Sequence, residues 1–530
     1  MVAMTICLLV CFFAVMIGVG FYTRRHATDV NGFVLGGRGV GPWLTAFAFG
    51  TSYFSAVIFV GYAGQFGWNF GLASTWAGLG NAFIGSLLAW NILGRRTRIM
   101  TQHLDAKTMP DFFGKRFGST PLKIAASIIV FVFLIPYTAS LYNGLSSLFG
   151  LVFNIPYWVV ILIMAVLTGI YVIFGGYMAT AINDFIQGII MLFGICAVIV
   201  SVLNDNGGLL EACKKLSAVE ADGWAGGAYT SFFGPDPLAL LFVVILTSLG
   251  TWGLPQMVGK FYAIKSEKDI HKGTVISTVF AIIVAGGCYF LGGFGRLYEA
   301  NIEKNQETGK PLFDTIIPTM LSTLPNVVIA IVIVLVLSAS MSTLSSLVLT
   351  SSSTFTLDVI KPYMKKEMSE KKQVAIMRVF IVFFIAVSAV IAVFKDANPQ
   401  VTFIAQMMGV SWGALAGAFL APFMYGLYWK GITKASTAVC FVWGVGIAVV
   451  QMVISLGGVD VTGWGTVLSY IFKSSINSGV VAMVGGLIIV PIVSLITPKM
   501  NKETVDNTFA CYETTYTAQI RKKDRLETEE

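Results

Sequence analysis

"NVVIAIVIVLVLSASMSTLSSLVLTSSSTFT", residues 326–356, starts as an aliphatic membrane helix and turns hydroxyl-rich half-way along. It is also longer than the roughly 20 residues that a helix needs to cross a bilayer. An unpartnered hydroxyl in hydrocarbon costs free energy. These Ser and Thr side chains are therefore either buried in protein and bonded to their own helix, or they line something polar. Other parts of the sequence are needed to distinguish these two possibilities.

The composition predicts an all-α polytopic membrane protein. Of the 530 residues, 56% are hydrophobic and only 12% are charged, whereas soluble domains average about 25% charged residues. The apolar residues come in blocks of roughly 20, the length of a transmembrane helix. A transmembrane barrel would instead alternate apolar and polar residues in segments of about ten, and no such alternation is present. We expect a multi-pass protein of the cytoplasmic membrane.

The apolar blocks predict about thirteen transmembrane helices. We place them at about 2–22, 41–69, 72–94, 122–150, 155–176, 182–203, 236–262, 273–298, 322–356, 375–394, 401–428, 435–456 and 478–497. Thirteen is an odd number, so the termini lie on opposite sides of the membrane. Residues 1–497 then form one transport domain, and 498–530 form a polar, flexible cytoplasmic tail.

The distribution of Lys and Arg predicts the orientation. With the N-terminus outside, 28 of the 35 Lys and Arg residues fall on the cytoplasmic side, the four at 260–272 included. Cytoplasmic loops carry such an excess, so we predict N-out and C-in. This bias accounts for the formal charge of +8 without a nucleic-acid partner.

Other features argue against alternative classes. The first 22 residues lack the charged start and cleavage site of a signal peptide, so they are expected to be a mature span. The seven cysteines imply no disulfide framework, and the three histidines lack metal-ligand spacing. With no nucleophile–base pair in view, an enzyme is not expected.

The hydroxyl-rich stretch gains meaning from its spacing. On a helix, Ala339, Ser342, Ser345 and Ser346 share one face, and Thr343 flanks it. Such residues often bond back to their own helix or allow close helix packing. Alternatively they bind Na+, a hard cation that favours oxygen ligands. The patch alone leaves both interpretations open.

Other intramembrane features point toward a site. Asp184 lies near the start of a span, where it is either a helix N-cap or a functional carboxylate. Residues 41–69 are interspersed with Gly, Ser and Thr, as a discontinuous helix would be, and Pro255 interrupts a later span between glycines. Gly- or Pro-interrupted spans in two corresponding halves mark the binding site of many transporters.

Three motifs resemble the sodium/solute symporter family. They are "FVLGGRGVGPWLTAFAFGTSYFSA" (33–56), "FGGYMATAINDFIQG" (174–188) and "SASMSTLSS" (338–346), and they come in the family's order on the matching spans. The resemblance implies a core of two inverted five-helix repeats, here about 41–203 and 236–428. One helix precedes this core and two follow it.

The resemblance also implies the ion sites. A principal Na+ would lie between spans 2 and 9. Its ligands would be the backbone carbonyls of Thr51, Phe54 and Ala339 and the hydroxyls of Ser342 and Thr343. Some members hold a second Na+ on residues that correspond to Asp184, Ser345 and Ser346, and this sequence has all three.

The substrate is less constrained. "LGGRGVGPWLTA" and Tyr137 resemble the proline branch of the family, whereas Tyr53, "SAV" (55–57) and "GLP" (253–255) are closer to the pantothenate and monocarboxylate branches. The substrates of these branches carry a carboxylate, which suits the positive end of a half-helix. The residues expected to contact substrate are Tyr53, Ser55, Tyr137, Thr251, Trp252 and Pro255.

The expected function is Na+-coupled import of a small carboxylate-bearing solute such as proline, pantothenate or a monocarboxylate. The alternatives are Na+-coupled uptake of another solute such as a sugar, a membrane sensor that moves nothing, or a channel. A sensor usually carries a fused signalling domain and a channel repeated filter loops, and neither is visible in the sequence. Apart from the solute, Na+ and the lipid bilayer, no obligate protein partner is evident.

Overall fold

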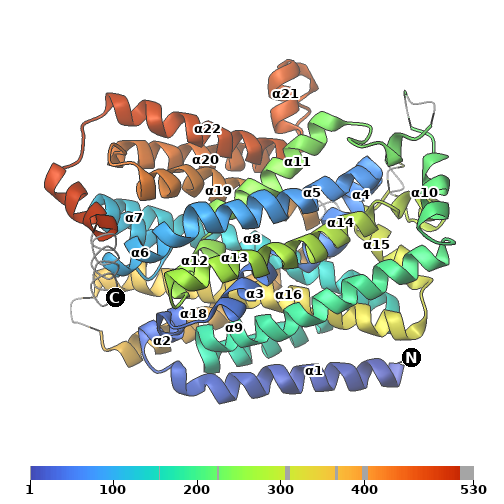
Figure 1. Cartoon of the computed structure of the whole chain (residues 1–530), viewed down its shortest axis with the longest axis horizontal. Coiled ribbons are helices and arrows are strands. Elements are labelled where there is room, and N and C mark those ends of the chain that lie inside the picture. Colours follow the sequence, from blue (N-terminus) through green and yellow to red (C-terminus); the bar gives the residue numbers. More distant parts are fainter. Residues whose placement is uncertain are drawn as a thin grey trace, which may run out of the picture.

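Helices make up nearly all of the described chain. The computed structural model describes residues 2–153, 156–221, 223, 226–304, 309, 311–364, 368–396 and 404–513. Among them, strand-like pairing is limited to two isolated β-bridges. The long helices lie side by side along one common direction (Figure 1). The all-α architecture is as predicted.

The helices have the following bounds. The α-helices are α1 (Val2–Thr23), α2 (Val30–Leu35), α3 (Pro42–Tyr53), α4 (Ala63–Phe70), α5 (Thr75–Gly80), α6 (Arg95–His103), α7 (Met109–Phe117), α8 (Thr120–Phe153), α9 (Tyr157–Asp205), α10 (Leu209–Ser217), α11 (Pro237–Leu249), α12 (Pro255–Ala263), α13 (Glu267–Ala281), α14 (Gly287–Gly292), α15 (Phe313–Ser322), α16 (Asn326–Thr354), α17 (Lys361–Tyr363), α18 (Glu370–Asp396), α19 (Ile404–Tyr428), α20 (Lys434–Leu456), α21 (Thr466–Phe472) and α22 (Ser475–Ile496). Among the 3₁₀ and π segments, η3 (Val57–Tyr62), η5 (Asn81–Leu88), η8 (Gly250–Gly253) and η11 (Phe355–Ile360) bear on the site.

By length and apolarity, ten helices of the described residues could cross a membrane, or eleven if the bent pair α11–α12 is one span. Two of these helices are too long for one crossing. At 49 residues, α9 would extend about 73 Å if straight, more than twice the hydrocarbon thickness. The helical stretch Val57–His103 has 47 residues. Each therefore has to contain a reversal.

A glycine marks the reversal in α9. Gly176 has φ +54° and ψ −144°, far from helical values. Just before it, Gly175 lies against Thr23 at the end of α1. Just after it, the amide of Asn183 donates to the carbonyl of Met16, further back along α1. The chain thus turns back at Gly176, between the predicted spans 155–176 and 182–203.

The second reversal occurs at Gly71, where φ is +59° and ψ −137°. Before it, Gly67 lies against Gly292, and after it Gly78 lies against Gly286, so the chain reverses its direction along α14. With these two reversals, the described helices match the thirteen predicted spans one to one. The first residues of the predicted span 401–428 lie outside the described residues. The count of thirteen crossings stays a prediction.

Two helices are broken in the middle. The first break follows α3, where Phe54 is extended (φ −79°, ψ 109°) before the chain resumes as η3. The second separates α11 and η8 from α12, where Leu254 is extended (φ −85°, ψ 120°) and the axis bends by 47°. The discontinuity predicted within 41–69 is therefore present, and Pro255 starts a new helix after a break.

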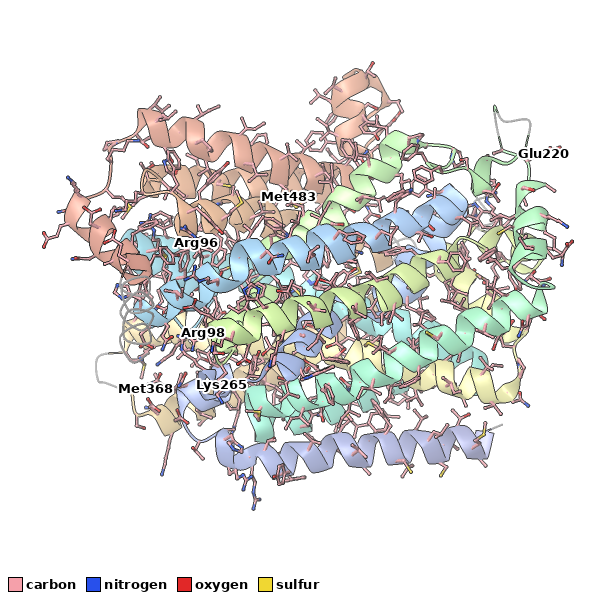
Figure 2. All side chains as sticks on the ribbon, viewed as in Figure 1. Arg96, Arg98, Glu220, Lys265, Met368 and Met483 are labelled. Atoms are coloured by element: carbon pink, nitrogen blue, oxygen red, sulfur yellow. The ribbon has the colours of Figure 1, made fainter. Side chains whose placement is uncertain are left out.

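The two ends of the molecule differ in charge. Helix α1 starts at the right-hand end in Figure 1, and α22 finishes at the left-hand end, as termini on opposite sides require. Arg96, Arg98 and Lys265 lie toward that left-hand end and Glu220 at the other (Figure 2). Lys260 is an exception to the predicted distribution: it is 3% exposed inside α12, so it is not a loop charge. The N-out orientation stays a prediction.

Part of the tail is helical. Residues 502–513 form a helix that packs on the charged end of the molecule. The guanidinium of Arg116 lies 4.9 Å from the ring centre of Phe509. The hydroxyl of Tyr512 donates to the carbonyls of Arg96 and Leu427. The flexible tail expected from residue 498 is thus ordered at its start, and 514–530 lie outside the described residues.

Candidate functional site

The hydroxyl-rich face of α16 meets the break after α3. The Ser342 hydroxyl lies 3.2 Å from the carbonyl oxygen of Thr51 and 3.2 Å from that of Ala339. The Thr343 hydroxyl lies 3.1 Å from the Thr51 carbonyl, 3.4 Å from that of Phe54 and 3.1 Å from that of Ala339. All five oxygens named in the sequence prediction are therefore linked by direct contacts of 3.1–3.4 Å.

The break itself makes these oxygens available. Because α3 ends at Tyr53, its last carbonyls have no following helical turn to bond. Those of Thr51 and Phe54 face α16 instead and accept its hydroxyls. A helix C-terminus also carries partial negative charge, which favours a cation. The local fold thus supplies neutral oxygens and a weak negative potential at one place.

The spacing of these oxygens suits a small hard cation. A cation held at the 2.3–2.6 Å typical of Ca2+–oxygen contacts would set neighbouring ligand oxygens about 3.3–3.6 Å apart in an octahedral arrangement. The observed separations of 3.1–3.4 Å lie at or just below that range. A small adjustment of side chains would therefore admit the ion.

Neighbouring hydroxyls on α16 behave differently. Ser340 and Ser345 donate to carbonyls of their own helix, those of Val336 and Ser342. Closer to the charged end, Ser352 and Ser353 bond back in the same way. These four hydroxyls thus follow the first interpretation, bonding back to their own helix, whereas Ser342 and Thr343 also reach the carbonyls of α3, and Na+ binding there stays a prediction.

Three predicted substrate residues cluster beside the break. The rings of Tyr53 and Tyr137 each lie 6.2 Å from that of Trp412 on α19. The hydroxyls of Tyr53, Ser55 and Tyr137 and the indole nitrogen of Trp412 are buried without a hydrogen-bond partner. The Tyr137 hydroxyl lies near Ser55 and Trp412 but does not reach hydrogen-bond geometry with either. Unpartnered buried polar groups are costly, so this cluster has the character of a ligand site.

The other three predicted substrate residues lie elsewhere around the second break. Thr251 donates to the carbonyls of Gly85 and Ser248. The Trp252 indole donates to the carbonyl of Ile84. Their polar groups are thus already paired against η5, and Pro255 lines a pocket on the charged side of the molecule. Their side chains thus point to η5 or to this pocket, although the neighbouring Gly250 lies against Trp412 of the Tyr53 cluster.

Asp184 is buried and faces a lysine. It lies two turns after Gly176, inside α9 and fully buried, so the N-cap interpretation is wrong. Its carboxylate is 3.7 Å from the amino group of Lys260. That amino group also donates to the Ser346 hydroxyl at 3.0 Å. Two of the three side chains expected at a second Na+ site therefore already contact a positive charge.

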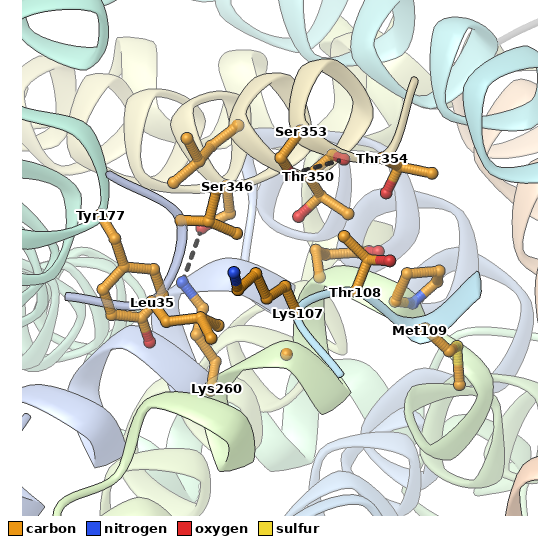
Figure 3. A pocket seen from close by; sticks show the side chains of 15 residues that line it. Leu35, Lys107, Thr108, Met109, Tyr177, Lys260, Ser346, Thr350, Ser353 and Thr354 are labelled. Carbon is orange, nitrogen blue, oxygen red and sulfur yellow. Dashed lines mark hydrogen bonds between the residues drawn. The ribbon is translucent and has the colours of Figure 1, made fainter. Parts of the chain in front are cut away.

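A pocket leads from this lysine toward the charged end of the molecule. It has a volume of about 40 Å³, and Tyr177, Gln256, Lys260 and Ser346 are among the residues that line it. Lys107 and Thr108, on the loop before α7, also line it (Figure 3). Figure 3 also shows the Lys260 amino group reaching Ser346 across the pocket. The lining thus includes both the buried lysine and the loop before α7.

Beyond this pocket lies a second ion-pair network. Lys123 contacts Asp111 at 2.7 Å and Asp358 at 3.1 Å, which ties α7, α8 and η11 together. Burial alone would raise the pKa of Asp111, but the ammonium groups of Lys123 and Lys115 hold it below its ordinary value. Asp358 is a buried carboxylate that was not singled out from the sequence.

Sequence reasoning also missed Lys260 and Trp412. A signal for Lys260 was available: it is a lone charge five residues after Pro255 in an apolar run, and intramembrane charges are usually functional. No comparable signal marks Trp412, because a tryptophan in an apolar span is most often a packing residue. Its role depends on which helix lies opposite.

Comparison with known proteins identifies the family. The model of the sodium:solute symporter family matches residues 33–444. The chain belongs to this family. The symporter is a transporter and not an enzyme, Na+ is its coupling ion, and it is a multi-pass protein of the cell membrane. The resemblance drawn from the three motifs is thereby confirmed.

Named relatives cover most of the symporter. It is 29% identical over 481 residues to the osmoregulated proline transporter OpuE of Bacillus subtilis, covering 89% of this chain and 93% of the relative. It is 29% identical over 448 residues to a sodium/proline symporter of Staphylococcus aureus, covering 83% and 84%. The solved outward-open structure of a Na+-coupled sialic acid symporter superimposes with a TM-score of 0.71 at 17% identity, covering 94% and 99%. That structure supports the transporter fold.

Proposed function

We propose that the symporter imports a small carboxylate-bearing solute together with Na+ bound between α3 and α16. The observation that carries the proposal is the convergence of five oxygens, from Thr51, Phe54, Ala339, Ser342 and Thr343, at the break after α3. None of the five belongs to a charged side chain. A neutral site binds Na+ weakly enough to release it, as a transport cycle requires.

The adjoining cluster supports a carboxylate as the recognised group. The hydroxyls of Tyr53, Ser55 and Tyr137 and the Trp412 indole can all donate hydrogen bonds, and all four lack a partner. No carboxylate belongs to this cluster to repel an anionic group. The segment after the break begins a new helix at η3, whose amino-terminal end favours negative charge. The hydrogen-bond donors and the helix dipole therefore both favour an anionic group such as a carboxylate.

Proline is the first solute to test. The two named relatives are a proline transporter and a sodium/proline symporter, and proline carries a carboxylate. Pantothenate and short monocarboxylates carry one as well, and Tyr53, Ser55 and the "GLP" at 253–255 suggested them from the sequence. The substrate panel should include all three classes and a sugar as the non-acidic comparison.

The positions of the two sites explain coupling. Phe54 contributes a carbonyl to the ion site, and its chain neighbours Tyr53 and Ser55 belong to the substrate cluster. Na+ that orders this break also orders the groups that bind substrate. By linkage, substrate then improves Na+ affinity by the same factor. The membrane potential contributes about 2.3 kcal/mol per charge per 100 mV.

The test is transport by purified protein in liposomes. An inward Na+ gradient should drive accumulation of a radiolabelled member of the panel, and an equal gradient of K+ should not. Counterflow of labelled against unlabelled substrate separates a carrier from a channel, and binding without accumulation would indicate a sensor. Uptake that is independent of Na+ for every transported solute would overturn the proposal.

A further inference from the structure

The Lys260 amino group lies where the resemblance places a second Na+. Lys260 is 3% exposed and Asp184 is fully buried. The amino group is 3.7 Å from the carboxylate and 3.0 Å from the hydroxyl of Ser346. It also lies 5.2 Å from the ring centre of Tyr177. A carboxylate, a hydroxyl and an aromatic face thus surround one covalently attached cation.

We propose that Lys260 permanently takes the place of a second Na+, so that the symporter moves one Na+ with each substrate molecule. This inference rests on the proposed function, because it takes the site between α3 and α16 as the place of the remaining Na+. It replaces the prediction of a second, exchangeable Na+ on Asp184, Ser345 and Ser346.

The residues do not fit a second Na+ while the lysine is present. The Ser346 hydroxyl is engaged by Lys260 and by Ser52, which lies 2.8 Å away. The Ser345 hydroxyl donates to the Ser342 carbonyl. A Na+ in contact with Asp184 and Ser346 would therefore lie beside a like charge, on a hydroxyl oxygen that already accepts a hydrogen bond from Lys260. One buried carboxylate balances one cation.

The tethered charge also joins three helices of the fold. Lys260 is on α12, after the second break, whereas Asp184 and Ser346 are on α9 and α16. Ser346 is about one helical turn beyond the Na+ ligand Ser342. The ammonium thus occupies the space between the principal site and the pocket of Figure 3. Unlike Na+, it cannot leave through that pocket, so it adds no ion to the coupled flux.

The decisive measurement is the number of Na+ ions bound. Radiolabelled Na+ binding to purified wild-type protein should saturate at about one ion per chain, with a Hill coefficient of about 1, since this coefficient cannot exceed the number of sites. Lys260→Ala removes the tethered charge and leaves Asp184 in place, so about two ions should bind. Lys260→Arg keeps a charge and should bind one.

Two further variants identify where the additional ion binds. Asp184→Asn in the wild-type background should still bind one Na+, whereas Lys260→Ala with Asp184→Asn should return from two to one. Thr343→Val should lower Na+ binding at ordinary concentrations in the wild type, but leave one ion in the Lys260→Ala background. The ratio of Na+ to substrate flux in liposomes should likewise be about one to one in the wild type.

The results separate this inference from the proposed function. A wild type that binds or transports two Na+ per substrate overturns the inference and leaves Na+ symport intact. This wild-type measurement tests the inference even if Lys260→Ala does not fold. A folded Lys260→Ala variant that still binds only one Na+ overturns it too. Wild-type Na+ binding that Thr343→Val does not affect would instead overturn the site between α3 and α16.

Discussion

Thr343 offers the sharpest test of the ion site. Its hydroxyl contacts three of the other four proposed ligand oxygens, those of Thr51, Phe54 and Ala339, at 3.1, 3.4 and 3.1 Å. Thr343→Val removes that oxygen but keeps the branched shape at a fully buried position. The packing of α16 is therefore preserved, and the expected effect of the substitution is weaker binding of Na+.

The expected size follows from the loss of one oxygen that faces a charge. Hydrogen bonds to charged groups contribute about 1.5–3 kcal/mol, and we take a neutral ligand to Na+ as comparable. At about 1.4 kcal/mol for each tenfold change, the Na+ concentration for half-maximal uptake should rise by about 10-fold to about 150-fold. A water molecule that replaces the hydroxyl would shift the result toward the lower figure.

The assay is the initial rate of uptake into liposomes, measured over a range of external Na+ at one low substrate concentration. Thr343→Ser retains the oxygen and should stay close to the wild type. Ser340→Ala is the matched control, because the Ser340 hydroxyl donates only to the Val336 carbonyl of its own helix. A half-maximal Na+ concentration within about threefold of the wild type for Thr343→Val, or an equal shift for Ser340→Ala, would refute the reasoning.

Three further predictions concern substrate, packing and the ion network. Tyr137→Phe removes a buried hydroxyl that has no partner, so the half-saturating substrate concentration should rise about tenfold while the thermal midpoint does not fall; a loss of stability alone would count against a substrate role. A Cβ on Gly67 would lie 1.9 Å from the Gly292 carbonyl oxygen, whereas one on Gly18 meets nothing within 4 Å; Gly67→Ala should abolish the monodisperse size-exclusion peak and Gly18→Ala should retain it. Lys123→Met leaves Asp358 buried without its 3.1 Å partner, and a loss of about 3 kcal/mol should appear as a lower midpoint of thermal unfolding.

Local signals were enough to predict the helical architecture. The length of each apolar block predicted where helices run, since a bilayer allows few alternatives. The Gly-, Ser- and Thr-rich composition of 41–69 predicted a discontinuous helix, and the break at Phe54 lies within it. The local sequence does not show which apolar blocks belong to one continuous helix. Only the φ and ψ of Gly176 show that two predicted spans are joined by a single-residue reversal.

The same limit applies to the candidate site: residues on short motifs could be predicted, whereas residues that act through contacts with distant segments could not. The residues proposed as Na+ ligands lie on two short motifs, so a family resemblance could name them. Lys260 and Trp412 contribute through contacts with distant segments: Lys260 with α9 and α16, and Trp412 with Tyr53 and Tyr137. A charge count assigned Lys260 to a loop because it lies near a charged stretch. Its burial depends on tertiary packing, which no local pattern records.

The two breaks together suggest why a single Na+ can suffice. At the first break, Phe54 presents a carbonyl to the proposed site of an exchangeable Na+. After the second break, Lys260 presents a positive charge that stays. A buried, ionised carboxylate such as Asp184 is strongly destabilising without a partner, and the Lys260 amino group is the cation nearest to it in this structure. Under the proposal, this charge on α12 keeps the carboxylate neutralised, and the Na+ proposed at Phe54 would be the one ion whose binding and release are coupled to uptake.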